Sequence, residues 1–243
     1  VLTVSLPAAL RAQLGPMIDE GQKKAIEKET DKSKREALSA LFQALRPTLK
    51  SGELDIAADL RGPNDKGLYS AVAGIKVKDG AAIDKTFRKI VADLPAEERK
   101  AVKFDVEKVG SVGIHRVTPD KNDKNTKDTF GDNPVYFAVR EDAFLVGLGD
   151  KGLSALKEAV AAEPKASKVM DFQMAMSQLA PLMVKDNKSA PEVAKKVFAN
   201  DKDSDKLRIS IEGGKVLKLR MAMKAQAIAF FTALQQAKKD SAQ

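Results

Sequence analysis

The residues best placed to do chemistry are three glycines spaced as in a dinucleotide-binding loop. Gly147, Gly149 and Gly152 form the pattern G-x-G-x-x-G after an apolar run and before a helical pattern. In a parallel sheet, such glycines let the backbone approach a pyrophosphate at a helix N-terminus, and a later acidic residue binds the ribose. Asp171 lies near the distance expected for that acid. One hypothesis from these residues is therefore an NAD(P)-dependent oxidoreductase.

The surrounding pattern argues against a nucleotide site. The strand before the motif follows its neighbour through a short turn at 140–142, which predicts an antiparallel pair. The same strand-to-helix junction recurs at 75–83 without the three glycines, and an acidic residue, Asp79 or Asp150, is expected to cap each helix. "VGLGDKG" resembles the fingerprint of the hydroxyisobutyrate-type dehydrogenases over this short stretch alone. We therefore favour a tight structural corner, with no bound cofactor.

Methionine is concentrated late in the chain. Six of the seven methionines lie between 170 and 223, and "MAM" occurs at 174–176 and at 221–223. Residues i and i+2 of a strand share a face, so two such pairs could offer thioethers to monovalent copper. Methionine more commonly fills cores and adaptable apolar surfaces, and core packing is the favoured interpretation. A second interpretation is an apolar-ligand pocket lined by Phe172, Met174, Met176, Met221, Met223 and Phe231.

Composition excludes several kinds of catalytic and metal site. The chain has no cysteine and one histidine, His115, so it cannot form a thiolate site or a metal site with two histidines. His115 lies between Ile114 and Arg116 on a predicted strand, without a serine or an acid in a recognisable motif. We expect it to lie on the more polar face of a sheet, and we assign no catalytic residue.

Four acids match the spacing of a calcium loop: Asp201, Asp203, Asp205 and Glu212. Lys206 stands where the loop needs glycine for its sharp turn. The residues that follow read as a strand, which carries Glu212 too far away to share an ion. A solvated turn is the better interpretation, and no metal site is predicted.

The net charge of +8 could indicate an anionic partner, but lysines alternate with acids along most of the chain. A nucleic-acid surface needs uncompensated cations on one face, so nucleic acid is not expected as a partner. No stretch approaches the roughly 20 apolar residues of a membrane-spanning helix, so we expect no transmembrane segment. With nucleic acid and a transmembrane segment not expected, the expected partner is a protein or an apolar small molecule.

The hydrophobic pattern predicts an α+β fold. Strand, turn, strand and helix follow one another in residues 54–91 and again in residues 206–236. We interpret residues 1–95 and 168–243 as two copies of a β-α-α-β-β-α repeat, with central antiparallel strands and a helix at 96–167, in one continuous globular unit. The expected architecture is a mostly antiparallel sheet with helices packed on one face.

The runs "GLYSAVAGIKVKDGAAIDKTFRKIV" and "VYFAVREDAFLVGLGDKGLSALKEAV" resemble, at the level of pattern, uncharacterised exported bacterial proteins with hairpin-plus-helix repeats. The resemblance implies export, to the periplasm or the cell surface, after removal of a signal peptide. It brings no activity and no site residues. The sequence therefore favours a non-catalytic exported binding or scaffold protein. The alternatives are a carrier of a small apolar ligand between helices and sheet, and the NAD(P)-dependent enzyme.

Overall fold

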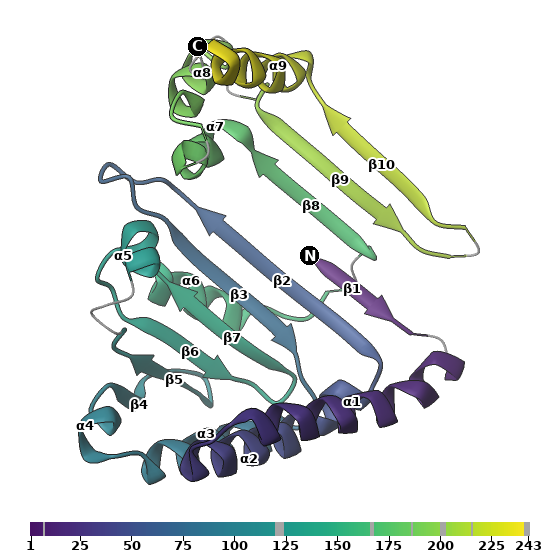
Figure 1. Ribbon diagram of the computed structural model, residues 1–243, viewed down its shortest axis with the longest axis vertical. Helices are drawn as coiled ribbons and strands as arrows, with labels where there is room; N and C mark the ends of the chain where they lie inside the picture. Colours follow the sequence, from purple (N-terminus) through teal and green to yellow (C-terminus); the bar gives the residue numbers. More distant parts are fainter. Residues whose placement is uncertain are drawn as a thin grey trace. The chain divides into compact units, whose positions relative to one another are not determined.

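The chain forms two compact units in the computed structural model (Figure 1). The large unit comprises residues 3–165, and the small unit comprises residues 1–2 and 166–243. Each strand pair whose register is given is antiparallel, which confirms the predicted α+β class. The structure describes residues 1–6, 8–119, 124–165, 168–185, 187–199, 203–214 and 216–240.

In the large unit, tight turns at 110–111 and 140–142 each join two strands with two-residue alternation, and these strands therefore pair as antiparallel neighbours. Their order across the sheet is β1-β2-β3-β7-β6-β5-β4. The bounds are β1 (Leu2–Ser5, of which Leu2 belongs to the small unit), β2 (Glu53–Arg61), β3 (Ser70–Lys76), β4 (Val102–Val109), β5 (Val112–Val117), β6 (Val135–Val139) and β7 (Ala143–Leu148).

The helices of the large unit include a long polar hairpin. Asp19 in its first helix accepts hydrogen bonds from Arg46 and Lys50 in its second, each at 2.9 Å. Asp31 caps the second helix by accepting a hydrogen bond from the backbone N–H of Lys34. The bounds of the helices are α1 (Ala8–Lys28), α2 (Lys32–Lys50), α3 (Gly80–Asp93), α4 (Ala96–Arg99), α5 (Lys124–Phe130) and α6 (Gly152–Ala161).

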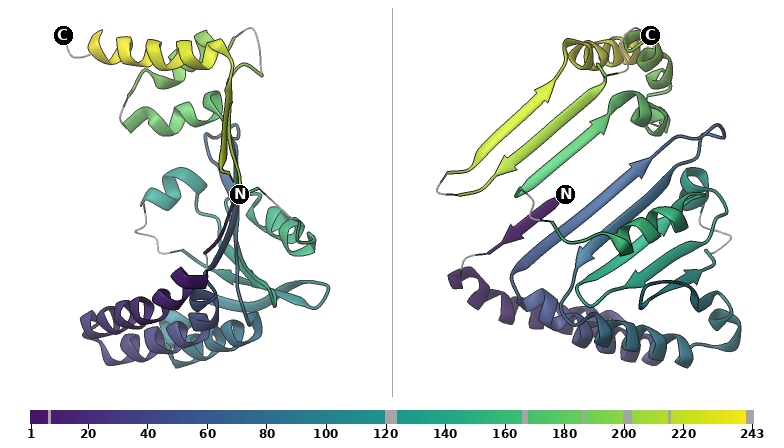
Figure 2. Two further views of the ribbon diagram at one scale, coloured as in Figure 1. Left: turned by 90° about the vertical axis from the view of Figure 1, so that its right-hand side faces the viewer. Right: turned by 180° about the vertical axis from the view of Figure 1, so that it is seen from behind.

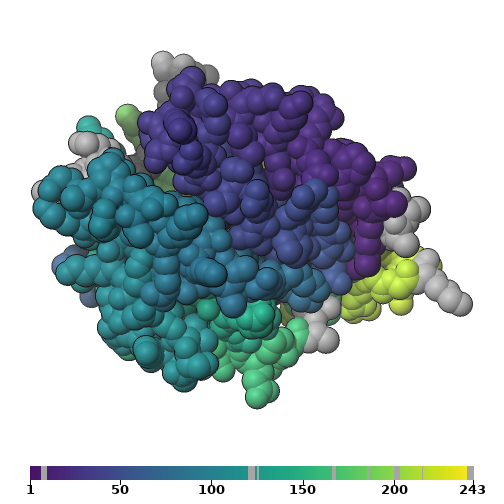
Figure 3. Space-filling view, turned by 90° about the horizontal axis from the view of Figure 1, so that it is seen from below, coloured from purple at the N-terminus to yellow at the C-terminus, as the bar shows by residue number. Residues whose placement is uncertain are grey.

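Helices lie on both faces of the large unit's sheet, where the sequence predicted one face. Phe137 contacts Phe87 of α3, whereas the next residue, Ala138, packs in a core with Leu156 of α6. Successive strand residues point to opposite faces, so α3 and α6 cover opposite sides (Figure 2). From below, the purple α1–α2 hairpin and the green α6 also lie on opposite sides (Figure 3). The reason is that β6 is apolar on both faces, and both faces need cover.

The small unit has its helices on one face, as predicted (Figure 2). Its strands are β8 (Met170–Ala175), β9 (Lys206–Glu212) and β10 (Lys218–Met223), in the order β10-β9-β8. Its helices are α7 (Met176–Leu179), a 3₁₀-helix η1 (Ala180–Lys185), α8 (Ala190–Val197) and α9 (Ala225–Asp240). Its core is Met176, Ala180, Ala190, Ala194, Phe198, Leu207, Phe230 and Leu234.

The predicted repeat corresponds to a similar order of elements in two stretches. Residues 2–93 give one strand, two helices, two strands and one helix. Residues 170–240 give one strand, then α7, η1 and α8, then two strands and one helix. The descent of both stretches from one duplicated segment stays a prediction.

Candidate binding surface

One face of the small unit's sheet is apolar across all three strands. Residues directly opposite each other in antiparallel strands share a face, as do residues i and i+2 of one strand. The registers place β8 residues opposite β9 residues, and those opposite β10 residues, in three rows. We call these nine residues the apolar face: Met170, Phe172 and Met174 of β8, Ile211, Ile209 and Leu207 of β9, and Leu219, Met221 and Met223 of β10.

The helices cover only part of the apolar face. Met174, Leu207 and Met223 form one complete row across the sheet, and all three belong to the core or pack against it. At the uncovered end, Leu219 is 65 % exposed and Met221 is 57 % exposed. Apolar side chains this exposed and this close together typically mark a binding surface.

The uncovered part of this face borders a free strand edge. In the part of the chain that the structure describes, β10 has one neighbouring strand, β9, to which it pairs over six residues. Leu217, just before β10, is 71 % exposed. On the opposite face of β10, Lys218 and Arg220 are exposed. A free strand edge presents unpaired backbone N–H and C=O groups, which can pair with another chain.

The six residues predicted to line an apolar pocket fall into two groups. Met174, Met176 and Met223 pack in the core or against it, and Phe172, Met221 and Phe231 are exposed. None of the six lines either cavity described below. Met176 belongs to α7, since β8 ends at Ala175, so the first methionine pair does not share a strand as the copper hypothesis requires.

The three glycines form a packed corner in the large unit. A Cβ atom on Gly147 would overlap the carbonyl oxygen of Gly152. Gly149 has φ of +84°, and a Cβ atom there would overlap the carbonyl oxygen of Tyr69. The close backbone contacts therefore explain why glycine occupies these positions, without a bound ligand. Asp171, the predicted ribose-binding acid, pairs with Arg208 in the small unit, with 2.7 Å between Arg208 Nη2 and Asp171 Oδ2.

The two predicted helix caps have different outcomes. Asp79 caps α3 by accepting a hydrogen bond from the backbone N–H of Ala82, as predicted. The prediction for Asp150 was wrong, because the N-cap residue of α6 is Lys151, whose side chain forms no cap. The hydroxyl of Ser70 accepts a hydrogen bond from the Lys151 N–H and donates one to Asp150. These bonds tie the corner to β3. The hydrogen bonds that Asp150 accepts from Ser70 and Asn64 hold the pKa of its carboxyl below its usual value.

His115 is buried, with 2 % of its surface exposed, and does not lie on a wet face. Its Nδ1 accepts a hydrogen bond from the backbone N–H of Asp105 at 3.0 Å. Nε2 of the neutral ring therefore carries the proton, and this N–H donates a hydrogen bond to Asp84 on α3 at 3.1 Å. Arg88 bridges the two carboxylates, since its guanidinium binds both Asp84 and Asp105. Burial lowers the pKa of His115, although both carboxylates act against this.

The His115 cluster fastens α3 to the sheet. Phe104 and Phe137 have ring centroids 5.0 and 4.8 Å from that of His115, which leaves the imidazole enclosed. Asp105 reaches it through a bulge in β4, where φ of Asp105 is +53°. The i, i+4 spacing of Asp84 and Arg88 on a predicted helix could have indicated their ion pair. The bulge had no sequence signal, so the contact of Asp105 with His115 could not be predicted.

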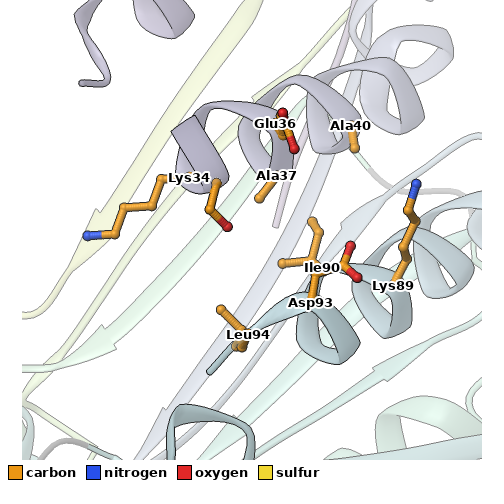
Figure 4. Close-up of a pocket in the computed structure, with 9 residues that line it drawn as sticks. Lys34, Glu36, Ala37, Ala40, Lys89, Ile90, Asp93 and Leu94 are labelled. Carbon is orange, nitrogen blue, oxygen red and sulfur yellow. The ribbon is translucent and has the colours of Figure 1, made fainter. Parts of the chain in front are cut away.

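A shallow cavity of about 190 Å³ lies between α2 and α3 (Figure 4). Ala37, Ala40, Ile90 and Leu94 supply its apolar lining. Lys34 points away from it at its rim (Figure 4). At about 190 Å³ the cavity is smaller than the pockets of roughly 300 Å³ and more that hold small ligands.

A second cavity, of about 470 Å³, lies in the small unit beside α7, α8 and the start of β9. Asp205 lines it and accepts a hydrogen bond from the hydroxyl of Ser177. Asp203 pairs with Lys206 at 2.6 Å, and Asp201 lies outside the described residues. Among the residues that are described, no three acidic or histidine side chains could hold a metal ion together.

No described helix combines the length and the apolar character needed to cross a bilayer. Comparison of the chain with protein-family models, with curated proteins and with solved structures found no match.

Proposed function

We propose that this protein is an exported, non-catalytic binding protein that holds a partner polypeptide on the uncovered part of the apolar face. The observation that supports this most directly is the exposure of Leu219 and Met221 beside the free edge of β10. A strand that is apolar on one exposed side is unfavourable in water and becomes favourable when a partner covers it. Export rests on the resemblance of the hairpin-plus-helix pattern to exported bacterial proteins.

The size of the surface suits a polypeptide that makes further contacts. Leu217, Leu219 and Met221 are 57 to 71 % exposed, and Phe172 is 39 % exposed. Burying the exposed parts of these four side chains would contribute about 5 kcal/mol. Loss of translational and rotational freedom on association costs at least about 4 kcal/mol. The apolar contacts alone would therefore give weak binding, so the partner must also use the backbone or the charges of this region.

An enclosed small molecule fits this surface less well. Ligand pockets surround most of their ligand, whereas the most exposed residues of the apolar face lie on an edge strand. A carrier would show a lipid-sized adduct in native mass spectrometry of freshly purified protein.

The nicotinamide hypothesis is disfavoured by the neighbours of β7. Both neighbouring strands, β3 and β6, run antiparallel to it. A dinucleotide site needs a crevice between parallel strands at the glycine turn, and this arrangement does not provide one.

Photo-crosslinking tests the proposal. Benzoylphenylalanine is placed at Leu219, at Met221 or, as a control, at Met17 of α1, which is 68 % exposed. We expect one polypeptide from the source cells to be crosslinked from positions 219 and 221 but not from position 17. The purified polypeptide should bind wild-type protein and lose about tenfold in affinity with Leu219→Lys, while Met17→Lys has no effect. Equal crosslinking from position 17, or binding that Leu219→Lys leaves unchanged, would contradict the proposal.

A further inference from the structure

We infer that the partner segment binds as an added β-strand on the free edge of β10, and that it alternates apolar with acidic residues. This inference rests on the proposed function and specifies which partner the same surface takes.

The geometry of β10 suits strand addition. Its six residues pair with β9 in one continuous register, from Lys218 opposite Glu212 to Met223 opposite Leu207. In an antiparallel ladder, alternate residues direct their N–H and C=O groups toward one neighbour and the rest direct them away. Half of the backbone groups of β10 therefore point to its free edge, where an extended segment can bind them.

The side chains of β10 define the required alternation. Leu219 and Met221 lie on the apolar face, and Lys218 and Arg220 lie on the opposite face. In an added strand, residues opposite Leu219 and Met221 lie on the apolar face as well, so apolar side chains are favoured there. Residues opposite Lys218 and Arg220 lie beside the two cations.

The charge beside β10 favours acids at those positions. Neither Lys218 nor Arg220 forms an ion pair within the described residues, whereas Arg208 pairs with Asp171 and Lys168 pairs with Glu212 on the same sheet. Residues 206–240 contain eight lysines and arginines but two aspartates and glutamates. Glu212, directly opposite Lys218, interacts electrostatically with both cations but already pairs with Lys168, so an acidic partner would meet a local excess of positive charge.

The same charges disfavour a second copy of the chain as the occupant. A symmetric antiparallel pair of β10 strands that keeps both apolar faces on one side brings like charges together. Centred on Leu219, it places Lys218 opposite Arg220 twice, and centred on Arg220, it places the two Arg220 side chains opposite each other. Centred on Met221, it places Arg220 opposite Ala222 and Lys218 opposite Lys224, the residue after β10. Like charges directly opposite are destabilising, so the favoured occupant is a different chain.

The test uses a fluorescein-labelled peptide of β10's length that alternates valine with glutamate. We expect it to bind the full chain in fluorescence anisotropy, and to bind more weakly as salt rises, whereas a valine–lysine peptide does not bind. The double variant Lys218→Glu/Arg220→Glu should reverse this preference. The control Lys238→Glu/Lys239→Glu, which changes the net charge equally on α9, should keep it. A valine–glutamate peptide that does not bind, or a preference unchanged by the β10 variant, overturns the inference.

Backbone methylation separates strand addition from simple apolar contact. Two isomers of the valine–glutamate peptide carry N-methyl groups on alternate residues, either on the valines or on the glutamates. One set faces β10 and the other faces solvent, so one isomer should lose binding by about tenfold or more and the other should keep it. Equal behaviour of the two isomers overturns strand addition. If crosslinking at Leu219 still succeeds in that case, the proposed function survives and this inference alone fails.

Hydrogen exchange gives an independent readout on the protein. With the valine–glutamate peptide bound, the amide hydrogens of β10 that point away from β9 should exchange more slowly, and those that already bond to β9 should change little. Uniform slowing over the small unit, or none in β10, contradicts the inference. A dimeric mass of the free protein that Leu219→Lys makes monomeric would instead identify a second copy as the occupant.

Discussion

Acidification from pH 7 to pH 5 is expected to destabilise the large unit through His115. Burial lowers the pKa of this imidazole below its usual value of 6.5, and Arg88 acts in the same direction. Below pH 6.5 the unfolded chain therefore takes up a proton that the folded chain resists. The stability that depends on the neutral imidazole is fully present above that pH and falls as the pH decreases toward the folded pKa.

The size of the expected loss of stability is set by the single proton that His115 binds. A single titrating group changes the free energy of unfolding by at most about 1.4 kcal/mol per pH unit. His115 is the chain's one histidine. The carboxyl groups with lowered pKa values, such as Asp105 beside Arg88, have ordinary pKa values of 3.8 or 4.5 in the unfolded chain and lose their contribution to stability at lower pH. The loss between pH 6.5 and pH 5 therefore reports His115.

Tyrosine fluorescence during urea unfolding measures the stability of the large unit, in which His115 lies. The chain has no tryptophan, and its two tyrosines, Tyr69 and Tyr136, both belong to the large unit. His115→Gln should be less stable at pH 7 by about 1–3 kcal/mol, since it leaves the Asp105 N–H without its buried acceptor. It should also lose the pH dependence between pH 6.5 and 5. Arg88→Met removes a neighbouring cation, so the pKa of His115 rises and the slope becomes shallower than in wild type. A wild-type stability that is flat or increases on acidification would refute the reasoning.

Three further predictions concern packing. Leu156→Ala, at a fully buried position of α6, should cost about 2–5 kcal/mol in urea unfolding followed by tyrosine fluorescence, and a loss under about 1 kcal/mol would contradict the packing of α6 on the sheet. Gly149→Ala should lower the melting temperature, because Gly149 has left-handed backbone and the added Cβ atom would overlap the Tyr69 carbonyl oxygen. An unchanged melting temperature of this variant would argue for a nucleotide loop, and so would a higher melting temperature of the wild type with millimolar NAD or NADP. Leu219→Lys/Met221→Lys should keep the free energy of unfolding within about 0.5 kcal/mol of wild type, measured by circular dichroism, because both side chains are mostly exposed; a larger loss would mean that they are core residues.

Local patterns predicted most of the fold. Two-residue alternation and tight turns located the strands and made them antiparallel, as in the β9–β10 hairpin around Gly213 and Gly214. The glycine corner was also interpreted correctly as part of an antiparallel arrangement, because a short turn cannot join parallel strands. The prediction that Asp150 caps the helix was wrong, because the Asp150 carboxylate instead accepts hydrogen bonds from Ser70 and Asn64, which are far away in sequence.

In strands without a bulge, the sequence by itself determined which residues share a face, because side-chain direction there depends only on position along the strand. It therefore placed Met221 and Met223 on one side of one strand. Only the tertiary structure decided that Met223 packs against the core while Met221 stays 57 % exposed. The helices cover one end of the sheet face and leave the other open, and that coverage depends on how helices distant in sequence pack, which strand periodicity cannot specify. The same holds for His115, whose partner Asp84 is 31 positions away in sequence.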